Sequence, residues 1–358
     1  MNETMDILVL PGDGIGPEIT AATEIVLREV QKRCSLSLNF RTEDIGFASL
    51  YRHGSTLPAD VFEAAQQSDG IILGPVSHYD YPPRDQGGIN VSSELRIKLD
   101  LFANIRPSRS RRGIPHWGRT PMDLVIVREN TEGFYSDRNM VAGTGEFMPT
   151  AEVALSIRKV TASASNRIAR TAFELASTRR SKVTAVHKAN VLKLSEKLFL
   201  KEVRKVAQDF PSVALEEVLV DAMAAYLVRD AARFDVIVTT NMFGDILSDE
   251  AAELSGSLGL AGGLNIGEKV AVAQAQHGSA PDIEGKNVAN PASLILSSAM
   301  LLDWLGERRN NPSLRRAAAS IEAALDTALA LPANRTADLG GKRSTQGFAA
   351  SVIDALGA

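Results

Sequence analysis

The chain has 358 residues, of which 44% are hydrophobic, and its formal net charge is −4. This length allows one large or two ordinary domains, and the negative charge argues against a general nucleic-acid-binding protein, which usually carries a basic surface. The single cysteine, Cys34, excludes an internal disulfide framework and a thiolate metal cluster within one chain. We see no secretory signal and no uncharged apolar run of about 18 residues, so we expect a cytoplasmic protein without a membrane span.

The chain opens with an apolar run at 6–10, three glycines and a helical pattern over 18–30, which is the order of a dinucleotide-binding turn. The glycine spacing is G-x-G-x-G followed by Pro17, whereas the dinucleotide motif is G-x-G-x-x-G. Residues 40–44 are a poor match for the strand with a closing acidic residue that normally follows. The pattern therefore favours a tight strand-to-helix turn, with a helix start at Pro17.

Strand-like runs then alternate with helical patterns, which predicts an α/β fold. The expected strands cover 6–10, 70–74, 123–127, 182–186, 216–220 and 235–240, and two of the expected helices cover 161–177 and 195–208. The basic, proline-containing stretch 106–119 is expected to form a surface loop, and 140–150 a second excursion.

The stretch "DVIVTTNMFGDILSDEAAEL" (235–254) combines a buried strand with a helix that is expected to begin near Phe243. Asp245 and Asp249 are four residues apart, so they lie on one face of that helix. Two like charges at this spacing destabilise a helix, and a divalent cation such as Mg²⁺ or Mn²⁺ would remove that cost. The alternative places Asp245 in the favourable first turn and Asp249 in solvent.

Charged side chains also stand where other expected strands end, which is the edge at which α/β sheets bind ligands. Arg128, Lys188 and Asp221 occupy such positions. With Arg96 and Arg106, Arg128 makes three guanidinium groups that match carboxylates bidentately. The combination indicates a site for an anionic substrate and a metal, although each arginine alone is more typical of a surface ion pair.

Seven blocks resemble the β-decarboxylating dehydrogenases, the family of isocitrate, isopropylmalate, homoisocitrate, tartrate and D-malate enzymes. They span residues 10–341 in the family's order: "LPGDGIGPE", "LRIKLDLFANIRP", "VRENTEGFY", "HKANVLK", "TTNMFGDILSDEAAEL", "HGSAPDIEGKNVANP" and "DLGG". The resemblance implies an isocitrate/isopropylmalate dehydrogenase-like two-domain α/β fold with a mixed sheet, not a GxGxxG Rossmann fold. Residues 1–102 and 255–358 would form a large cofactor-binding domain. Residues 103–254 would form a smaller domain with the dimer interface, the metal ligands and the catalytic lysine and aspartate.

The resemblance also implies roles for individual residues. Asp245 and Asp249 would hold Mg²⁺ or Mn²⁺ together with Asp221 of the partner subunit. Lys188, also from the partner, would serve the proton transfer from the 2-hydroxyl, and Tyr135 would protonate the enolate carbon after CO₂ leaves. The catalytic residues would thus be Tyr135, Lys188 and Asp221, and the substrate ligands Asn90, Ser92, Arg96, Arg106 and Arg128. A homodimer with shared active sites would be the smallest active form.

The cofactor implied by the resemblance is NAD, because the Asp282 carboxylate can accept hydrogen bonds from ribose hydroxyls and would repel a 2′-phosphate. Family members usually carry glutamate three residues before His277, and Gln274 stands there in this chain. The contact with the nicotinamide ribose would differ accordingly. The cofactor residues would be Ile15, Asn190, His277, Gly278, Ser279, Ala280, Pro281, Asp282, Ile283 and Asn290.

The helix face before Arg96 carries Ser92 and Ser93, where isopropylmalate enzymes carry leucines that receive the isopropyl group. Serines favour a polar substituent, so we expect a 3-substituted (2R)-malate such as isocitrate, homoisocitrate or a tartrate-like hydroxy-diacid. The alternatives are a 3-isopropylmalate dehydrogenase, with both serines facing elsewhere, and an inactive nucleotide-binding regulatory subunit.

Overall fold

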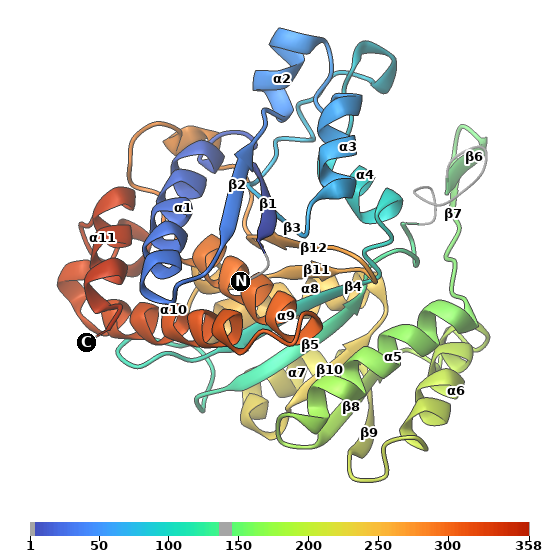
Figure 1. Cartoon of the computed structure of the whole chain (residues 1–358). Helices are drawn as coiled ribbons and strands as arrows, with labels where there is room; N and C mark the ends of the chain where they lie inside the picture. Colours follow the sequence, from blue (N-terminus) through green and yellow to red (C-terminus); the bar gives the residue numbers. More distant parts are fainter. Residues whose placement is uncertain (1–3, 136–144, 358) are drawn as a thin grey trace. The chain divides into compact units, whose positions relative to one another are not determined.

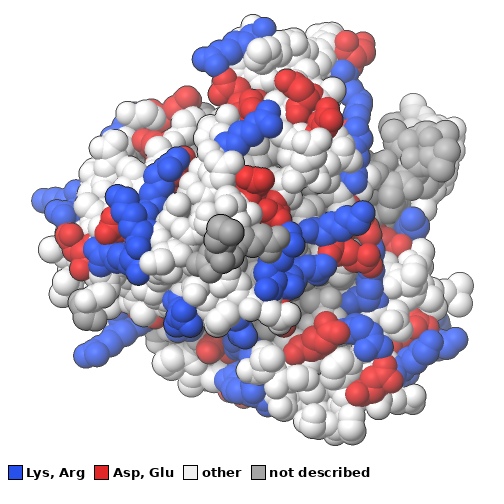
Figure 2. All heavy atoms as spheres, viewed as in Figure 1, with Lys and Arg blue, Asp and Glu red and all other residues white. Residues whose placement is uncertain are grey.

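The computed structural model describes residues 4–135 and 145–357, which divide into two compact units. The terminal unit comprises Met1–Leu95, Arg111–Pro115 and Ser257–Ala358, and the central unit comprises Arg96–Ser110 and His116–Gly256. No helix among the described residues is both long and apolar enough to cross a bilayer. Basic and acidic side chains are interspersed over the face shown in Figure 2.

The terminal unit contains a run of five neighbouring strands of mixed direction. Its strand order is β2 (Leu38–Thr42), β1 (Met5–Leu10), β3 (Gly70–Leu73), β12 (Ala271–Gln274) and β11 (Leu264–Ile266). Neighbouring strands are parallel from β2 to β12, and β11 is antiparallel to β12. β3 and residues 7–10 of β1 are buried on both faces and are continuous apolar runs, as parallel strands usually are.

Helices from both ends of the chain share the core of the terminal unit, as the blue and red helices of Figure 1 show. They are α1 (Gly16–Arg33), α9 (Ala292–Arg308), α10 (Pro312–Ala330) and α11 (Thr345–Ala355). Three shorter helices complete the unit up to its boundary: α2 (Gly46–His53), α3 (Ala59–Gln67) and α4 (Val91–Lys98). The carboxyl ends of the parallel strands β1, β3 and β12 meet at one edge, where three loops follow them.

The central unit contains a further run of neighbouring strands of mixed direction. Its strand order is β4 (Ala103–Arg109), β5 (Asp123–Glu129), β10 (Val236–Thr239), β8 (Lys182–His187) and β9 (Ala214–Leu219). Only β4 is antiparallel to its neighbour. Figure 1 shows α5 (Ala162–Ser177) and α6 (Ser195–Ala207) in front of these strands, with α7 (Val220–Asp230) and α8 (Asn241–Ser255) behind them.

The α/β class and the six expected strands are confirmed, with ends that differ by at most two residues. Two expectations need correction. Residues 106–109 of the expected surface loop belong to β4, and residues 146–150 of the expected excursion form β6 (Glu146–Thr150), which pairs with β7 (Val153–Ser156). Residues 140–144 lie outside the described residues. The poor match at 40–44 also overlaps a strand, because β2 covers Leu38–Thr42.

Candidate active site

Two arginines and two aspartates of the central unit form the carboxylate–arginine cluster (Arg106, Arg128, Asp245, Asp249). Arg106 lies in β4 and Arg128 in β5, while both aspartates lie on α8, one turn apart. Arg106 Nη1 lies 3.3 Å from Asp245 Oδ1 and 3.2 Å from Asp249 Oδ1, and Arg128 Nη1 donates to Asp245 Oδ1. Both carboxylates therefore face the same cationic nitrogen.

The two arginines also donate hydrogen bonds to polar side chains that were not identified from the sequence. Asn241 Oδ1 accepts from Nε and Nη2 of Arg128 at 3.0 and 2.7 Å. Asn104 Oδ1 accepts from Arg106 Nε at 2.5 Å, and Ser248 Oγ accepts from Arg106 Nη1 at 2.7 Å. These contacts fix the guanidinium planes. The side chains of Asp245 and Asp249 remain 38% and 52% exposed, respectively. The signal in the sequence was an asparagine at the start of α8, directly after a buried strand.

Gly244 allows α8 to pass close to β5. A Cβ atom at residue 244 would lie 2.7 Å from both Cβ and Cγ of Arg128. Because this helix also carries Asp245, the glycine lets a carboxylate come within reach of a buried guanidinium group.

Burial and charge act in opposite directions in the cluster. Burial, followed by the charge of Arg128, lowers the pKa of Arg106 to about 10. Burial alone would raise the pKa of Asp245, but the guanidinium groups of Arg128 and Arg106 outweigh it and hold that pKa below its usual range. The pKa of Asp249 is raised by burial and by the charge of Asp245, against the influence of Arg106. The two carboxylates therefore differ in their affinity for a proton.

Tyr135 and Arg96 extend the cluster. The Tyr135 hydroxyl donates to Asp245 Oδ2 at 3.4 Å, and its ring centroid lies 5.8 Å from the Arg128 guanidinium carbon. Arg96, near the end of α4, is close enough to contribute to the lowered pKa of Asp245. The structure thus gathers five predicted site residues of the central unit around Asp245.

Lys188 and Asp221 form a separate ion pair at the carboxyl ends of β8 and β9. Lys188 Nζ lies 2.7 Å from Asp221 Oδ1, and this hydrogen bond is the main cause of the lowered pKa of Asp221. The predicted cofactor residue Asn190 lies in an exposed turn two residues beyond Lys188.

Glu196 fixes the backbone from which the Lys188 side chain projects. Its Oε2 accepts from the Lys188 backbone N–H at 2.8 Å, and its Oε1 accepts from Arg158. Arg158 also donates to Ser195 Oγ and to Thr240 Oγ1, at 2.8 and 2.9 Å. The Glu196 side chain has no exposed surface, so this ion pair is fully desolvated on one side.

Replacing Glu196 by alanine is expected to lower the free energy of unfolding by about 3–5 kcal/mol, because it leaves the Arg158 charge buried without its partner. Urea denaturation measures this loss. The matched control is Glu217→Ala, since the Glu217–Arg204 pair is half exposed and a surface pair contributes about 0–1 kcal/mol. Equal losses in the two variants would contradict the assignment of a structural role to Glu196.

Ile15, a predicted cofactor residue, lies between β1 and α1, and the other predicted cofactor residues of the terminal unit follow β12. Ile15 N–H donates to Ser279 O at 2.8 Å, and a Cβ atom at Gly14 would lie 2.1 Å from that oxygen. The opening glycine loop therefore packs directly on segment 277–283, and Gly14, at φ +55°, is needed for this close approach. Ala280 has a φ of +39°, which turns the chain between Ser279 and the short 3₁₀ helix Pro281–Ile283 that contains Asp282.

His277, another predicted cofactor residue, is partly buried. Burial lowers its pKa, which favours the neutral ring. Its Nδ1 lies 3.0 Å from Gly278 O, while Nε2 is shielded from solvent and has no hydrogen-bond partner among the described residues. Gly278, by contrast, has open space around its Cα. Asn290 binds protein groups on both sides: its Oδ1 accepts from the N–H of Ala292, the first residue of α9, at 3.0 Å, and its Nδ2 donates to Asp338 at 2.9 Å.

The predicted substrate residues Asn90 and Ser92 belong to the start of α4. Asn90 Oδ1 accepts from Ser93 N–H at 3.1 Å, so this side chain caps the helix. Ser92 Oγ donates to Gln274 Oε1 at 3.2 Å, and Asn265 Nδ2 donates to the same oxygen at 3.4 Å. Gln274 and Ser92, two positions at which this chain differs from its relatives, therefore belong to one neutral hydrogen-bonded network with Asn265.

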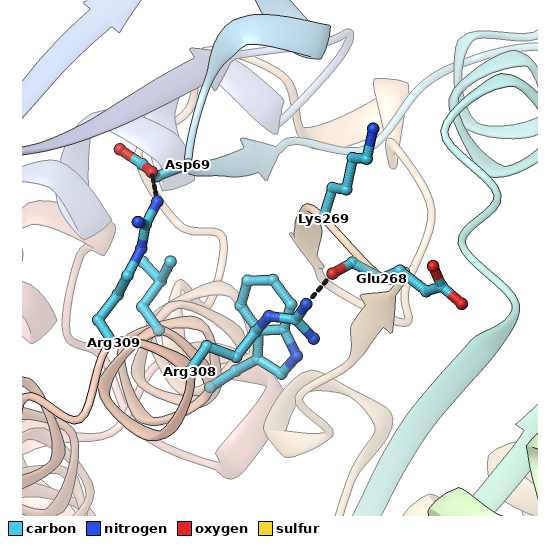
Figure 3. Close-up of a pocket in the computed structure, with 7 residues that line it drawn as sticks. Asp69, Glu268, Lys269, Arg308 and Arg309 are labelled. Carbon is cyan, nitrogen blue, oxygen red and sulfur yellow. Dashed lines mark hydrogen bonds and ion pairs between the residues drawn. The ribbon is translucent and has the colours of Figure 1, made fainter.

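A hollow of about 320 Å³ lies at the other edge of the terminal unit's sheet, beside the amino ends of β3 and β12. Figure 3 shows Arg309 paired with Asp69 and Arg308 donating to the Glu268 backbone oxygen. Arg308 also stacks on Trp304 at 4.8 Å. Because both guanidinium groups are already bound to protein oxygens, we do not consider this hollow a catalytic candidate.

Known proteins resemble the chain over nearly its whole length. The family model for isocitrate/isopropylmalate dehydrogenase matches residues 6–355. The chain is 42% identical to the isocitrate/homoisocitrate dehydrogenase of Thermus thermophilus over 353 residues and to the 3-isopropylmalate dehydrogenase of Methanothermobacter thermautotrophicus over 351 residues. Each alignment covers 98% of both chains. The crystal structure of isocitrate dehydrogenase from Methylococcus capsulatus superposes with a TM-score of 0.85 at 37% identity, covering 99% of both chains.

These similarities make the protein an oxidoreductase by class. More specifically, the chain belongs to the isocitrate/isopropylmalate dehydrogenase family, whose members are decarboxylating dehydrogenases. The family resemblance and the fold expected from it are confirmed.

Proposed function

We propose that the protein catalyses the NAD-dependent, Mg²⁺- or Mn²⁺-dependent oxidative decarboxylation of a 3-substituted (2R)-malate. The carboxylate–arginine cluster is the observation that carries the proposal. It combines two guanidinium groups that are almost fully buried with two partly exposed carboxylates on one helix face. The arginines would bind the substrate carboxylates, and their fixed planes favour bidentate binding.

Asp245 and Asp249 would hold the metal, because hard carboxylate oxygens are what Mg²⁺ and Mn²⁺ prefer. Both already face one cationic nitrogen, that of Arg106, so the positions fit a shared cation. Over the part of the chain that the structure describes, no group of three histidine, cysteine or acidic residues could hold a metal ion. Following the family resemblance, we propose Asp221 of the partner subunit as the third ligand. When bound, the cation would polarise the C2 oxygen and stabilise the charge that forms as CO₂ leaves.

Two side chains, those of Lys188 and Tyr135, would move protons. Lys188, held beside Asp221, would accept the 2-hydroxyl proton as hydride passes from C2 to the nicotinamide. The Tyr135 hydroxyl would deliver a proton to C3 after decarboxylation, and its hydrogen bond to Asp245 orients that hydroxyl. These residues also argue against the alternative of an inactive regulatory subunit, which needs neither proton donor nor metal ligands.

NAD would bind against segment 277–283. His277 supports this, since its shielded Nε2 would gain a hydrogen-bond partner from an adenine ring. Asp282 would accept from the adenosine ribose hydroxyls and repel a 2′-phosphate, which favours NAD over NADP.

A homodimer would complete the site. The β6–β7 hairpin offers a surface for it, because its apolar side chains are exposed: Phe147, Met148, Val153 and Leu155 are each 43–62% accessible. A hairpin of two strands is marginal in water and presents unpaired edges, so a second copy of the same hairpin is the occupant that we propose.

Replacing Leu155 by glutamate is expected to shift the protein from dimer to monomer, because a charge would be buried in the apolar contact. Sedimentation velocity measures the shift, and turnover should fall with the dimer fraction. The exposed Tyr79, which is outside the hairpin, provides the control Tyr79→Glu. Monomers that keep full activity would contradict the shared site.

The Ser92–Gln274–Asn265 network supports a polar substituent at C3 of the malate, since all three side chains are neutral hydrogen-bonding groups. Isocitrate, homoisocitrate or a tartrate-like diacid would satisfy them, whereas an isopropyl group would not. 3-Isopropylmalate remains the second candidate substrate, because the Methanothermobacter relative that carries this name is as similar as the Thermus relative.

The test is an assay of NADH formation with a panel of hydroxy-diacids, with and without EDTA. We expect EDTA to abolish turnover and Mg²⁺ or Mn²⁺ to restore it. Asp249→Asn should weaken metal affinity more than NAD affinity, because residue 249 would bind the metal and not the dinucleotide. Full activity in a demonstrably metal-free preparation would overturn the metal assignment.

A further inference from the structure

Asp13 is a buried carboxylate that the proposed reaction does not use. It lies in the loop between β1 and α1, with a side chain that is almost inaccessible to solvent (6% exposed). A charge in this position costs free energy unless hydrogen bonds compensate it. The donors that compensate it come from the start of α2 and from the loop after β3.

The donors come from segments that are far apart in the sequence. Phe47 N–H, at the start of α2, donates to Asp13 Oδ1 at 2.8 Å. Ser77 N–H donates to Oδ2 at 2.9 Å, and the Tyr81 hydroxyl donates to the same oxygen. The carboxylate therefore fastens the glycine loop after β1 to the start of α2 and to the loop after β3. We call these four residues the Asp13 clamp (Asp13, Phe47, Ser77, Tyr81).

The surrounding residues are shaped around this carboxylate. Gly46 has a φ of +67°, and a Cβ atom on it would lie 2.3 Å from Asp13 Oδ1. The ring of Tyr81 meets that of Phe47 edge to face, with centroids 5.1 Å apart. Burial, the hydrogen bond to Asp13 and the Asp13 charge raise the pKa of Tyr81 far above its ordinary value, so its hydroxyl remains a donor. Asp13 and Tyr81 thus act as a fixed pair.

The clamp is connected to segment 277–283 through Ser77. The hydroxyl groups of Ser77 and Ser279 are hydrogen-bonded at 2.8 Å, and both side chains are buried. On the other side of Asp13, Ile15 N–H donates to Ser279 O. Ser279 is therefore bound twice: its hydroxyl to Ser77 of the clamp, and its backbone oxygen to Ile15, two residues after Asp13.

From these contacts we infer that Asp13 and Tyr81 are positioning residues that hold segment 277–283 in the geometry that binds the dinucleotide. The inference rests on the proposed NAD site. Without the clamp the segment would occupy its binding geometry for only part of the time, and the apparent dissociation constant would rise by the inverse of that fraction. The chemical step, with the dinucleotide bound, would be largely unchanged.

The experiment measures NAD and NADP binding by calorimetry and steady-state kinetics on the full-length protein. Asp13→Asn is expected to raise the dissociation constant of the preferred dinucleotide about tenfold, since hydrogen bonds to a charged group are lost. The KM for that dinucleotide should rise in parallel, while kcat at saturation stays within about threefold. Tyr81→Phe should act in the same direction but less strongly. Because both residues act through one contact, the double variant should resemble Asp13→Asn rather than add to it.

Two further variants keep the test decisive if Asp13→Asn does not fold. Ser77→Ala leaves Asp13 and its donors in place but removes the link to Ser279, so it should also weaken dinucleotide binding. The matched control is Asp69→Asn. Asp69 accepts from Asp6 N–H at 2.8 Å and pairs with Arg309, at the amino end of β3 (Figure 3). Its loss should leave the dissociation constant within about twofold, because surface pairs contribute little and it lies at the other edge of the sheet.

Amide hydrogen exchange provides a readout that needs no turnover. In Asp13→Asn, exchange should accelerate at 46–47, 75–81 and 277–283, but not in α9 or α10. If Asp13→Asn and Ser77→Ala both bind the dinucleotide as tightly as the wild-type protein does, the positioning role of the clamp is overturned and the proposed function is left intact. An equal loss of affinity in Asp69→Asn would also overturn it. A wild-type protein that binds neither dinucleotide would overturn the proposed function itself, and the inference with it.

Discussion

Lys188→Met and Tyr135→Phe should each remove most of the turnover, yet a mixture of the two inactive proteins should regain activity. Removing a general acid or base costs about 10²–10⁴-fold in rate. Lys188→Met should suppress both hydride transfer and CO₂ release. Tyr135→Phe should act mainly on protonation after decarboxylation. Near-normal rates in both variants would contradict these roles.

The recovery depends on which chain supplies each residue. In the structure Tyr135 contacts Asp245, whereas Lys188 pairs with Asp221. If a site takes Tyr135 from one chain and Lys188 from the partner, a mixed dimer contains one intact site and one doubly defective site. Random exchange between symmetric dimers then restores about a quarter of the wild-type sites. If both residues come from one chain, no site is restored.

The matched control mixes Lys188→Met with Asp221→Asn. Since Lys188 and Asp221 form one ion pair, they would be supplied to a site by the same chain, and every site of the mixed dimer would lack one of them. This mixture should stay inactive although its subunits exchange. Recovery here, or its absence in the first mixture despite proven exchange, would contradict the shared site.

The sequence predicted the strands that are apolar on both faces and the charged residues at their carboxyl ends. Arg128 and Lys188 could be placed because a polar residue at the end of a buried strand has few positions available to it. Asp221 was placed in the same way, although most of β9 before it is exposed or only partly buried. β4 was mistaken for a loop for the opposite reason. Its buried side chains include Asn104, Arg106 and Ser108, so the alternation that indicates a strand is there, but in polar residues.

Residues that position others were beyond reach of sequence reasoning. Asn241 and Gly244 are defined by a contact with Arg128, which is more than a hundred residues earlier in the chain. Asp13 lies in a motif in which only the glycines indicated a role. Its donors Phe47 and Ser77 come from the start of α2 and from the loop after β3. The roles of these residues become visible only when the fold brings their partners together, because even the signal at Asn241, an asparagine at the start of a helix, does not indicate which side chain it binds.

Substrate choice is expected to depend on the start of α4 and on Gln274. The wild-type protein should use a substrate with a polar or charged group at C3 better than 3-isopropylmalate. Removing a full aliphatic contact costs about 1–3 kcal/mol, or about 10–200-fold in discrimination. Converting Ser92 and Ser93 to leucine should therefore raise kcat/KM for 3-isopropylmalate and lower it for the polar substrate. The measurement is kcat/KM for isocitrate, homoisocitrate, tartrate, D-malate and 3-isopropylmalate at saturating NAD.

The hydrogen bond from Ser92 to Gln274 separates the contributions of the two serines. Ser92→Leu removes that bond and should account for most of the change, whereas Ser93→Ala serves as the control because the Ser93 contact to Asn90 is made by its backbone N–H. Gln274→Glu keeps the shape of the network but adds a negative charge, so it should lower kcat/KM for a tricarboxylate more than for 3-isopropylmalate. If the wild-type protein instead prefers 3-isopropylmalate by about tenfold or more, at the low end of the range for one aliphatic contact, then the serines do not line the substrate pocket. The second candidate substrate would then replace the first.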